Sequence, residues 1–247
     1  MNYELFIAKR IIAGKKYKNS ISSPIIKIAI TAIALGIIIM LIAVATGAGL
    51  QYKIRDKMAG FKGHIQIVNY DANNSDVSTT AIKKEQDFYP TFKHVKGIKN
   101  VQIFANKAGI LRTKTDFEGI IFKGVSTDYD WSFFTEYMVE GRVPDFNQPR
   151  TREVLLSHTI INRLQLKLND TIISTFIKTV NSKLPSNKKY IITGIYNTGF
   201  LQFDKSMMIG DIREVQNLNK WTENEVGGFE VLLNDFDEID EKGEEVY

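Results

Sequence analysis

The chain has 247 residues, 32 of them Lys or Arg and 28 Asp or Glu, and it has no cysteine. The lack of cysteine excludes a disulfide framework and thiolate metal sites. Residues 1–63 carry a net charge of +8 and residues 64–247 a net charge of −4. A basic N-terminal segment followed by a mildly acidic remainder is typical of a membrane-anchored protein, not of a nucleic-acid binder.

Residues 3–13 predict a short amphipathic helix. Tyr3, Phe6 and Ile7 fall mostly on one helical face, whereas Lys9 and Arg10 lie largely elsewhere. Such a helix suits the cytoplasmic surface of a membrane, within a leader of residues 1–24. A disordered basic tail is the alternative.

Residues 28–50 form a charge-free apolar stretch of 23 residues, which exceeds the roughly 18–20 needed to cross a bilayer. This stretch predicts a transmembrane helix. A cleaved signal peptide is the alternative, but the basic leader is long and the apolar run exceeds the usual length of about 7–15 residues. Six basic residues precede the span and four follow it within a comparable distance, which favours a cytoplasmic N-terminus.

The helix is expected to continue beyond the membrane as a stalk. Leu50, Ile54, Met58 and Phe61 recur at spacings of three to four residues among charged side chains. Glycines at 60 and 63 offer an end to the helix. We therefore expect a transmembrane helix and stalk over residues 25–60, about 54 Å long at roughly 1.5 Å per residue.

Small residues four positions apart within the span suggest contact with another membrane helix. The two pairs are Ala32 with Gly36 and Ala43 with Gly47. Small side chains at this spacing let helices approach closely. The alternative is that alanine and glycine are simply common in membrane helices.

Downstream, short strands alternate with short helices, which predicts an α+β domain. The expected strands are 64–70, 101–113, 117–125, 153–157, 171–177, 190–196, 206–209 and 229–233. The expected helices are 87–95, 129–138, 159–166 and 212–218, with another starting at 235. We expect a turn at 140–144 and a hairpin around the polar loop 178–189.

The sequence predicts no catalytic residue, metal site or cofactor. His64, His94 and His158 are scattered and lack the spacing of zinc ligands. Neither G-x-S-x-G nor the phosphate-binding G-x-x-x-x-G-K-[ST] occurs. The acidic residues after 234 are interpreted as the solvated face of a helix.

Several short motifs together resemble the MacB/FtsX/LolC-LolE class of ABC-transporter permeases. Each motif is weak alone, but their order is fairly specific. They are Ala34-Leu35-Gly36, Gly47-Ala48-Gly49-Leu50, Glu140-Gly141-Arg142, the run Glu153 to Ser157 followed by Leu164, Leu168, Asn169 and Asp170, and Tyr190 to Tyr196. Asn169 stands where the family usually has glycine.

The resemblance implies a bacterial inner-membrane permease subunit with a periplasmic core domain at residues 61–247. In the family this domain has a porter-like part, interrupted by a β-rich, sabre-like part, here at about residues 130–205. ATP hydrolysis would take place on a separate ATPase subunit, and a second permease subunit would complete a homo- or heterodimer. Family members have three further membrane helices, so we expect this chain to be the N-terminal part of a longer protein.

The opening LFIAKRII and the long stalk look closest to the lipoprotein-releasing permeases. These draw lipoproteins from the inner membrane and pass them to a periplasmic carrier. Two alternatives stay open. One is an FtsX-like transmitter that activates a cell-wall hydrolase, and the other is a single-pass anchored binding or sensor domain.

This resemblance suggests two sites. A cavity for acyl chains between paired subunits is expected in the outer half of the span, at Met40, Leu41, Val44, Gly47, Ala48 and Leu50. The alternative is that these residues pack on neighbouring helices or membrane lipid. A carrier-binding loop is expected at Lys178, Lys183, Leu184, Pro185, Lys188 and Lys189, although it is shorter than the family's projecting hook. The alternative is that these lysines keep an exposed hairpin soluble.

Overall fold

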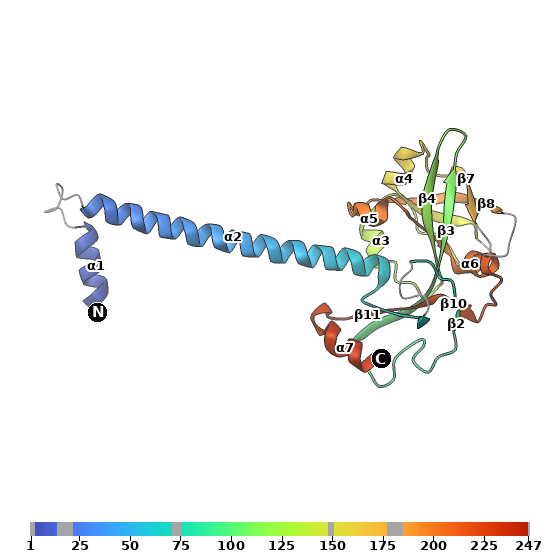
Figure 1. Ribbon diagram of the computed structural model, residues 1–247, viewed down its shortest axis with the longest axis horizontal. Helices are drawn as coiled ribbons and strands as arrows, with labels where there is room; N and C mark the ends of the chain where they lie inside the picture. Colours follow the sequence, from blue (N-terminus) through green and yellow to red (C-terminus); the bar gives the residue numbers. More distant parts are fainter. Residues whose placement is uncertain (1–2, 14–21, 71–75, 148–150, 177–184, 247) are drawn as a thin grey trace. The chain divides into compact units, whose positions relative to one another are not determined.

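The structure is a computed structural model that describes residues 3–13, 22–70, 76–147, 151–176 and 185–246. Figure 1 shows its helices and strands in chain order. The chain divides into two compact units, Met1–Arg55 and Asp56–Tyr247. They are described separately below.

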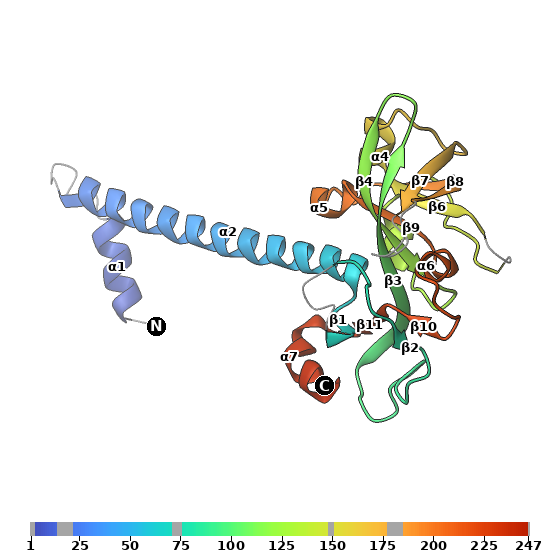
Figure 2. The ribbon, with the colours of Figure 1, turned by 45° about the vertical axis from the view of Figure 1, so that its right-hand side comes forward.

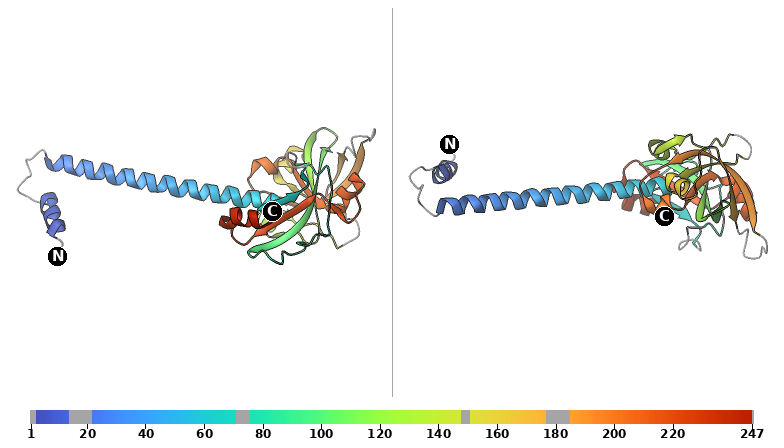
Figure 3. Two further views of the ribbon diagram at one scale, coloured as in Figure 1. Left: turned by 60° about the horizontal axis from the view of Figure 1, so that its bottom comes forward. Right: turned by 90° about the horizontal axis from the view of Figure 1, so that it is seen from above.

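The first unit contains α1 (Tyr3–Ala13) and most of α2 (Ser22–Lys62), so both predicted N-terminal helices are confirmed. Figure 3 shows α2 as one unbroken helix. Pro24 lies in its first turn, where the missing backbone N–H breaks no helical hydrogen bond. Gly63 ends it in the left-handed conformation with φ of +70°, which glycine adopts without strain.

Within the described residues, α2 is the one helix long and apolar enough to cross a membrane. Its apolar side chains are exposed in this chain: Ile33 is 64% and Met40 68% exposed. A Cβ placed at Gly36 or Gly47 would meet no atom within 4 Å. These positions are open to a neighbouring helix, and the predicted packing role of Ala32, Gly36, Ala43 and Gly47 stays a prediction.

The second unit is an α+β domain, as predicted. Its strands are β1 (Ile65–Val68), β2 (Ile82–Lys83), β3 (Ile98–Arg112), β4 (Phe117–Val125), β5 (Met138–Gly141), β6 (Glu153–Ser157), β7 (Thr171–Phe176), β8 (Ser186–Tyr196), β9 (Met207–Asp211), β10 (Glu225–Val226) and β11 (Gly228–Leu233). Its helices are α3 (Ser132–Glu136), α4 (His158–Arg163), α5 (Leu201–Asp204), α6 (Ile212–Asn219), the 3₁₀ helix η3 (Phe236–Glu238) and α7 (Ile239–Val246).

One large sheet organises this domain, in the order β1-β11-β3-β4-β9-β6-β8-β5. Strand β7 pairs with both β3 and β8, so β3, β4, β9, β6, β8 and β7 close into a ring. Figure 2 shows β7 and β8 beside β3 and β4. Within the ring, β4 and β9 are parallel, as are β6 and β8, while the other described pairs are antiparallel.

The alternation of side chains along β4 separates two hydrophobic cores. Ile120 and Phe122 belong to the core inside the ring, where α6 packs so close that a Cβ at Gly124 would lie 2.7 Å from the Ile212 backbone. Val125 belongs to a second core on the opposite face, with the end of α2, α3 and α5. The sheet therefore presents its outer face to the end of α2.

The predicted helix at 87–95 is wrong, since these residues adopt turns and bends. Pro90 disfavours helical geometry at the preceding residue. Phe88 and Tyr89 instead pack against Phe229 of β11, which is not a strand of the ring, and Phe92 stacks on Phe88. Burial of these three aromatic rings therefore outweighs the local helical pattern.

Two predicted loops are shorter than expected. Strand β5 takes in Glu140 and Gly141, the first residues of the predicted turn at 140–144. Strand β8 begins at Ser186 and pairs with β7, so Lys188 and Lys189 are strand residues and not loop residues. Lys178, Lys183 and Leu184 lie outside the described residues.

We predict that Phe122→Ala destabilises the second unit by about 3–5 kcal/mol, because it leaves a cavity in the core inside the ring. Phe117→Ala on the same strand is the control, since Phe117 is 73% exposed and should change stability by no more than about 0.5 kcal/mol. Urea unfolding of both variants checks this. Equal losses would contradict the assignment of the core.

Candidate functional site: the end of the long helix

Phe61, in the last turn of α2, is inserted into an aromatic cluster of the second unit. Its ring is 1% exposed and stacks on Phe203 with a centroid separation of 4.5 Å. Phe133 and Phe134 of α3 lie edge-on to it at 5.5 and 5.4 Å. Such ring pairs add to the free energy gained by burying apolar area. The amphipathic stalk pattern thus ends in a buried anchor.

Gly60 allows α3 to approach this turn closely. A Cβ at position 60 would lie 2.3 Å from the Phe133 ring, so any larger residue would displace this ring. The Tyr129 hydroxyl donates to the Gly60 carbonyl oxygen at 3.3 Å. This bond satisfies one of the carbonyls that the end of a helix leaves without a partner.

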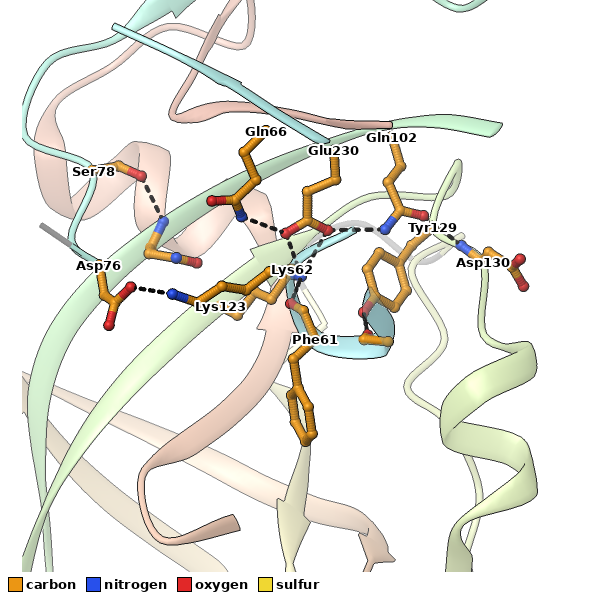
Figure 4. Close-up of polar contacts among 12 residues, drawn as sticks. Phe61, Lys62, Gln66, Asp76, Ser78, Gln102, Lys123, Tyr129, Asp130 and Glu230 are labelled. Carbon is orange, nitrogen blue, oxygen red and sulfur yellow. Dashed lines mark hydrogen bonds and ion pairs between the residues drawn. The ribbon is translucent and has the colours of Figure 1, made fainter. Parts of the chain in front are cut away.

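Lys123 of β4 satisfies the next carbonyl. Its ammonium donates to the Phe61 carbonyl oxygen at 2.5 Å and to both carboxylate oxygens of Glu230 at 2.7 Å (Figure 4). Both side chains of the ion pair are 1% exposed. A positive charge at the C-terminal end of a helix is also favoured by the helix dipole.

Glu230 of β11 lies in a polar row that crosses three strands. Gln66 of β1 and Gln102 of β3 are its direct cross-strand neighbours and donate to it at 3.2 and 3.0 Å. Gln102 in turn accepts the Asp130 backbone N–H at 2.9 Å. The carboxylate thereby gains partners for both oxygens, which a buried charge requires.

Burial lowers the pKa of Lys123, and the facing Glu230 carboxylate opposes this effect. The ammonium also lies 5.1 Å from the centre of the Tyr129 ring, a favourable cation–π distance. The Tyr129 hydroxyl has its pKa raised by burial and then by Glu230, so it stays a hydrogen-bond donor. The ion pair, its amides and the tyrosine form one connected polar network.

The first strand of this domain pairs with its last strand. Strand β1 follows α2 directly and pairs with β11, which leads into η3 and α7. The His64 backbone N–H donates to the Val231 carbonyl oxygen at 3.0 Å. The end of α2 is thus fixed to the strand that carries Glu230.

The network has the composition of an anchor and not of an active site. It pairs a lysine with a carboxylate, amides and backbone carbonyls, and it contains no nucleophile beside a general base. In the part of the chain that the structure describes, no group of three or more His, Cys, Asp or Glu residues could hold a metal ion.

The residues predicted for the two sites are not part of this network. The predicted cavity residues Met40, Leu41, Val44, Gly47, Ala48 and Leu50 lie on α2 in the first unit. Lys188 Nζ, on β8, lies 3.9 Å from Glu214 Oε2, whereas Lys189 is exposed on the other face of the strand. The two lysines that we predicted to act together in the carrier-binding loop therefore point to opposite faces of β8.

Sequence reasoning missed Lys123 and Glu230. Each is the one charged residue in the core-facing part of a strong strand, in IIFKGV and GFEVLL. Single opposite charges in two buried strands are a signal, because buried charges are stable only when paired. Their pairing could not be derived from local pattern, since 107 positions separate them.

We predict that Lys123→Met destabilises the second unit by about 3–5 kcal/mol, because Glu230 is left as an unpaired buried charge. The double variant Lys123→Met/Glu230→Leu should recover part of this loss. Lys99→Met is the control, since it removes the exposed ion pair with Asp130 and should cost less than about 1 kcal/mol. Unfolding free energies in urea check all three, and similar costs for Lys123→Met and Lys99→Met would contradict the anchor.

Comparisons with known proteins show which family this chain resembles. The family described as the MacB-like periplasmic core domain matches residues 28–246. The lipoprotein-releasing system transmembrane protein LolC of Neisseria meningitidis serogroup B is 21% identical over 239 residues, which cover 94% of this chain and 54% of LolC. The chain thus spans about half the length of this relative.

Two solved structures are also similar. The extracellular domain of the ABC-type transporter YknZ from Gram-positive bacteria has 16% identity and a TM-score of 0.45, covering 72% of this chain and 86% of that one. The periplasmic region of MacB from Actinobacillus actinomycetemcomitans has 14% identity and a TM-score of 0.45, covering 69% and 73%. The match to the family over most of the chain shows that this protein belongs to the MacB/FtsX/LolC type of ABC-transporter permeases.

Proposed function

We propose that the chain is part of an ABC-transporter permease subunit that extracts lipoproteins from the inner membrane for delivery to a periplasmic carrier. The single observation that carries the proposal is that α2 is continuous from its apolar stretch to the buried anchor at Phe61 and Lys123. In this proposal α2, which contributes residues to both units, would pass a displacement of the span to the domain. The chain itself would not be an enzyme.

The proposed assembly follows the family. A separate ATPase subunit would supply the energy, and a second permease subunit would face α2 through its small residues. The N-terminus would be cytoplasmic, and residues 61–247 periplasmic, with the sabre-like part at about 130–205. The relative LolC is a transmembrane protein of a lipoprotein-releasing system, which supports lipoproteins as the substrate.

The outer half of the membrane span, residues 28–50 of α2, would line the path of the acyl chains. Met40, Leu41 and Val44 are 68%, 64% and 63% exposed, so nothing in the described chain covers them. An apolar, uncovered wall suits acyl chains because burying apolar area is favourable whatever its shape. Gly47, Ala48 and Leu50 would continue this wall outward.

A candidate surface for the carrier lies on the outer side of β4, β3, β7 and β8. The register aligns Phe117, Arg112, Ile173 and Lys189 in one row across these strands. The next row is Gly119, Ile110, Thr175 and Asn187. We call these eight residues the four-strand face.

The four-strand face is apolar and basic. Phe117, Ile110 and Ile173 are 73%, 46% and 41% exposed, and neither row contains an acidic residue. Lys189 and Arg112 flank Ile173, on a body whose net charge is −4. This chemistry suits a carrier with an apolar opening and an acidic rim, and charge complementarity would mainly raise the association rate. We therefore propose the four-strand face as a surface for the carrier, in addition to the predicted carrier-binding loop at 178–189.

To test the substrate, a photo-crosslinking residue would be placed at Val44, or at Ile30 as the control, in the whole permease in growing cells. We expect adducts with lipidated proteins to be several-fold more abundant from position 44, because it lies in the outer half of the span. Equal labelling from both positions, or no lipoprotein adducts, would contradict the proposal. Adducts with a cell-wall hydrolase would favour an FtsX-like transmitter.

To test the four-strand face, we would compare Arg112→Glu/Lys189→Glu with Lys96→Glu/Lys167→Glu, which changes the net charge equally at exposed sites elsewhere. At low salt the first variant should associate with the purified carrier about tenfold more slowly, since local charge steers association. The control should stay close to the unaltered protein. Equal rates for both variants would remove the face from the mechanism.

A further inference from the structure

His64 joins the segment that follows α2 to the end of β11. It lies between the end of α2 and β1, and its Nδ1 accepts the backbone N–H of Leu233 at 2.8 Å. Its ring also lies edge-on to Phe236 of η3 at 5.4 Å. One side chain therefore holds the last residue of β11 and the first turn after it.

The hydrogen bond from Leu233 occurs where the β-ladder is irregular. The register of β11 against β3 shifts between Leu232 and Leu233. The next backbone N–H, that of Asn234, donates to the Gly97 carbonyl oxygen instead. His64 is thus the acceptor for the Leu233 N–H at the point where β11 ends.

An imidazole can accept this hydrogen bond only when it is neutral. Its Nδ1 must offer a lone pair, so the proton resides on Nε2. Protonation puts a hydrogen on both ring nitrogens, and Nδ1–H would then face the Leu233 N–H. The two donors repel, so the ring must turn away or the bond must open.

Charged groups from each packed element surround the ring. They share a cavity of about 460 Å³ with it: Asp56 on α2, Lys99 on β3, Asp130 before α3 and Glu136 at the end of α3. Glu230 of β11 is held by Lys123, and the carboxylates of η3 and the residue before it, Asp235, Asp237 and Glu238, are exposed. Burial is the largest influence and lowers the pKa of His64 below 6.5; Asp56 opposes this and Lys99 adds to it.

We propose that His64 is a pH-sensitive staple, which in its neutral form fixes the end of β11 to the start of β1 and releases it when protonated. Because the pKa is lowered by folding, the staple is intact above 6.5, the value for the unfolded chain, and is lost as pH falls through the lower value of the folded chain. The bond between the His64 backbone N–H and the Val231 oxygen does not titrate, so only the bond from Leu233 to the His64 ring opens. This role of His64 does not depend on which substrate the protein handles.

The test uses the full chain in lipid nanodiscs, labelled with ¹⁵N-leucine and ¹³C-histidine for NMR. We expect the Leu233 amide resonance to shift with the same midpoint as the His64 ring, below 6.5. The protection of this amide from hydrogen exchange should fall by roughly two- to tenfold through the titration, which corresponds to one ordinary hydrogen bond. A Leu233 amide that does not respond while His64 titrates would overturn the proposal.

His64→Asn supplies the matched variant. The asparagine Oδ1 can take the place of Nδ1 as acceptor but does not titrate, so Leu233 should stay protected at low pH. His94→Asn is the control, since His94 is exposed and the pH dependence of Leu233 should persist. The same pH dependence in His64→Asn as in the unaltered chain would also overturn the proposal.

Discussion

The buried ammonium of Lys123 is the constraint on which the arrangement of the second unit depends. A charge removed from water costs several kcal/mol unless its partners are well placed. Here the partners arrive from different segments, the Phe61 carbonyl from α2 and the Glu230 carboxylate from β11. Gln66 and Gln102 then tie β1 and β3 to the same carboxylate. If one partner moved away, the others would be left as buried polar groups without hydrogen bonds. These elements therefore hold one another in place.

This constraint gives the aromatic cluster its role. Phe61 supplies apolar burial, but apolar contacts alone are not directional and would tolerate rotation of the helix. The hydrogen bonds to the Gly60 and Phe61 carbonyls fix the rotation, and the absence of a side chain at Gly60 fixes the distance to α3. The end of α2 is thus held in angle and in depth, which a helix needs if it is to convey movement to a domain.

The sequence allowed prediction of what depends on local pattern. The helix over the apolar stretch of α2, the strands β3 and β4 and the hairpin of β7 and β8 all rest on periodicity within a short window, and the structure confirms them. The segment at 87–95 was mispredicted because three aromatic side chains gain more from the core than from a helix. The anchor could not be predicted because Lys123 and Glu230 meet only through the order of strands in the sheet. The site was therefore the least predictable part, since it depends on contacts distant in sequence.

The central claim is that the last turn of α2 belongs to the cooperative core of the domain. Hydrogen exchange of the full chain in nanodiscs tests it by comparing two backbone amides, that of Gly63, which donates to Ala59, and that of Val231 in β11. If the anchor holds, both amides exchange only when the domain unfolds, and their protection agrees within about fivefold, or roughly 1 kcal/mol. If Gly63 exchanges hundreds of times faster than Val231, the end of the helix opens by itself and the account is contradicted.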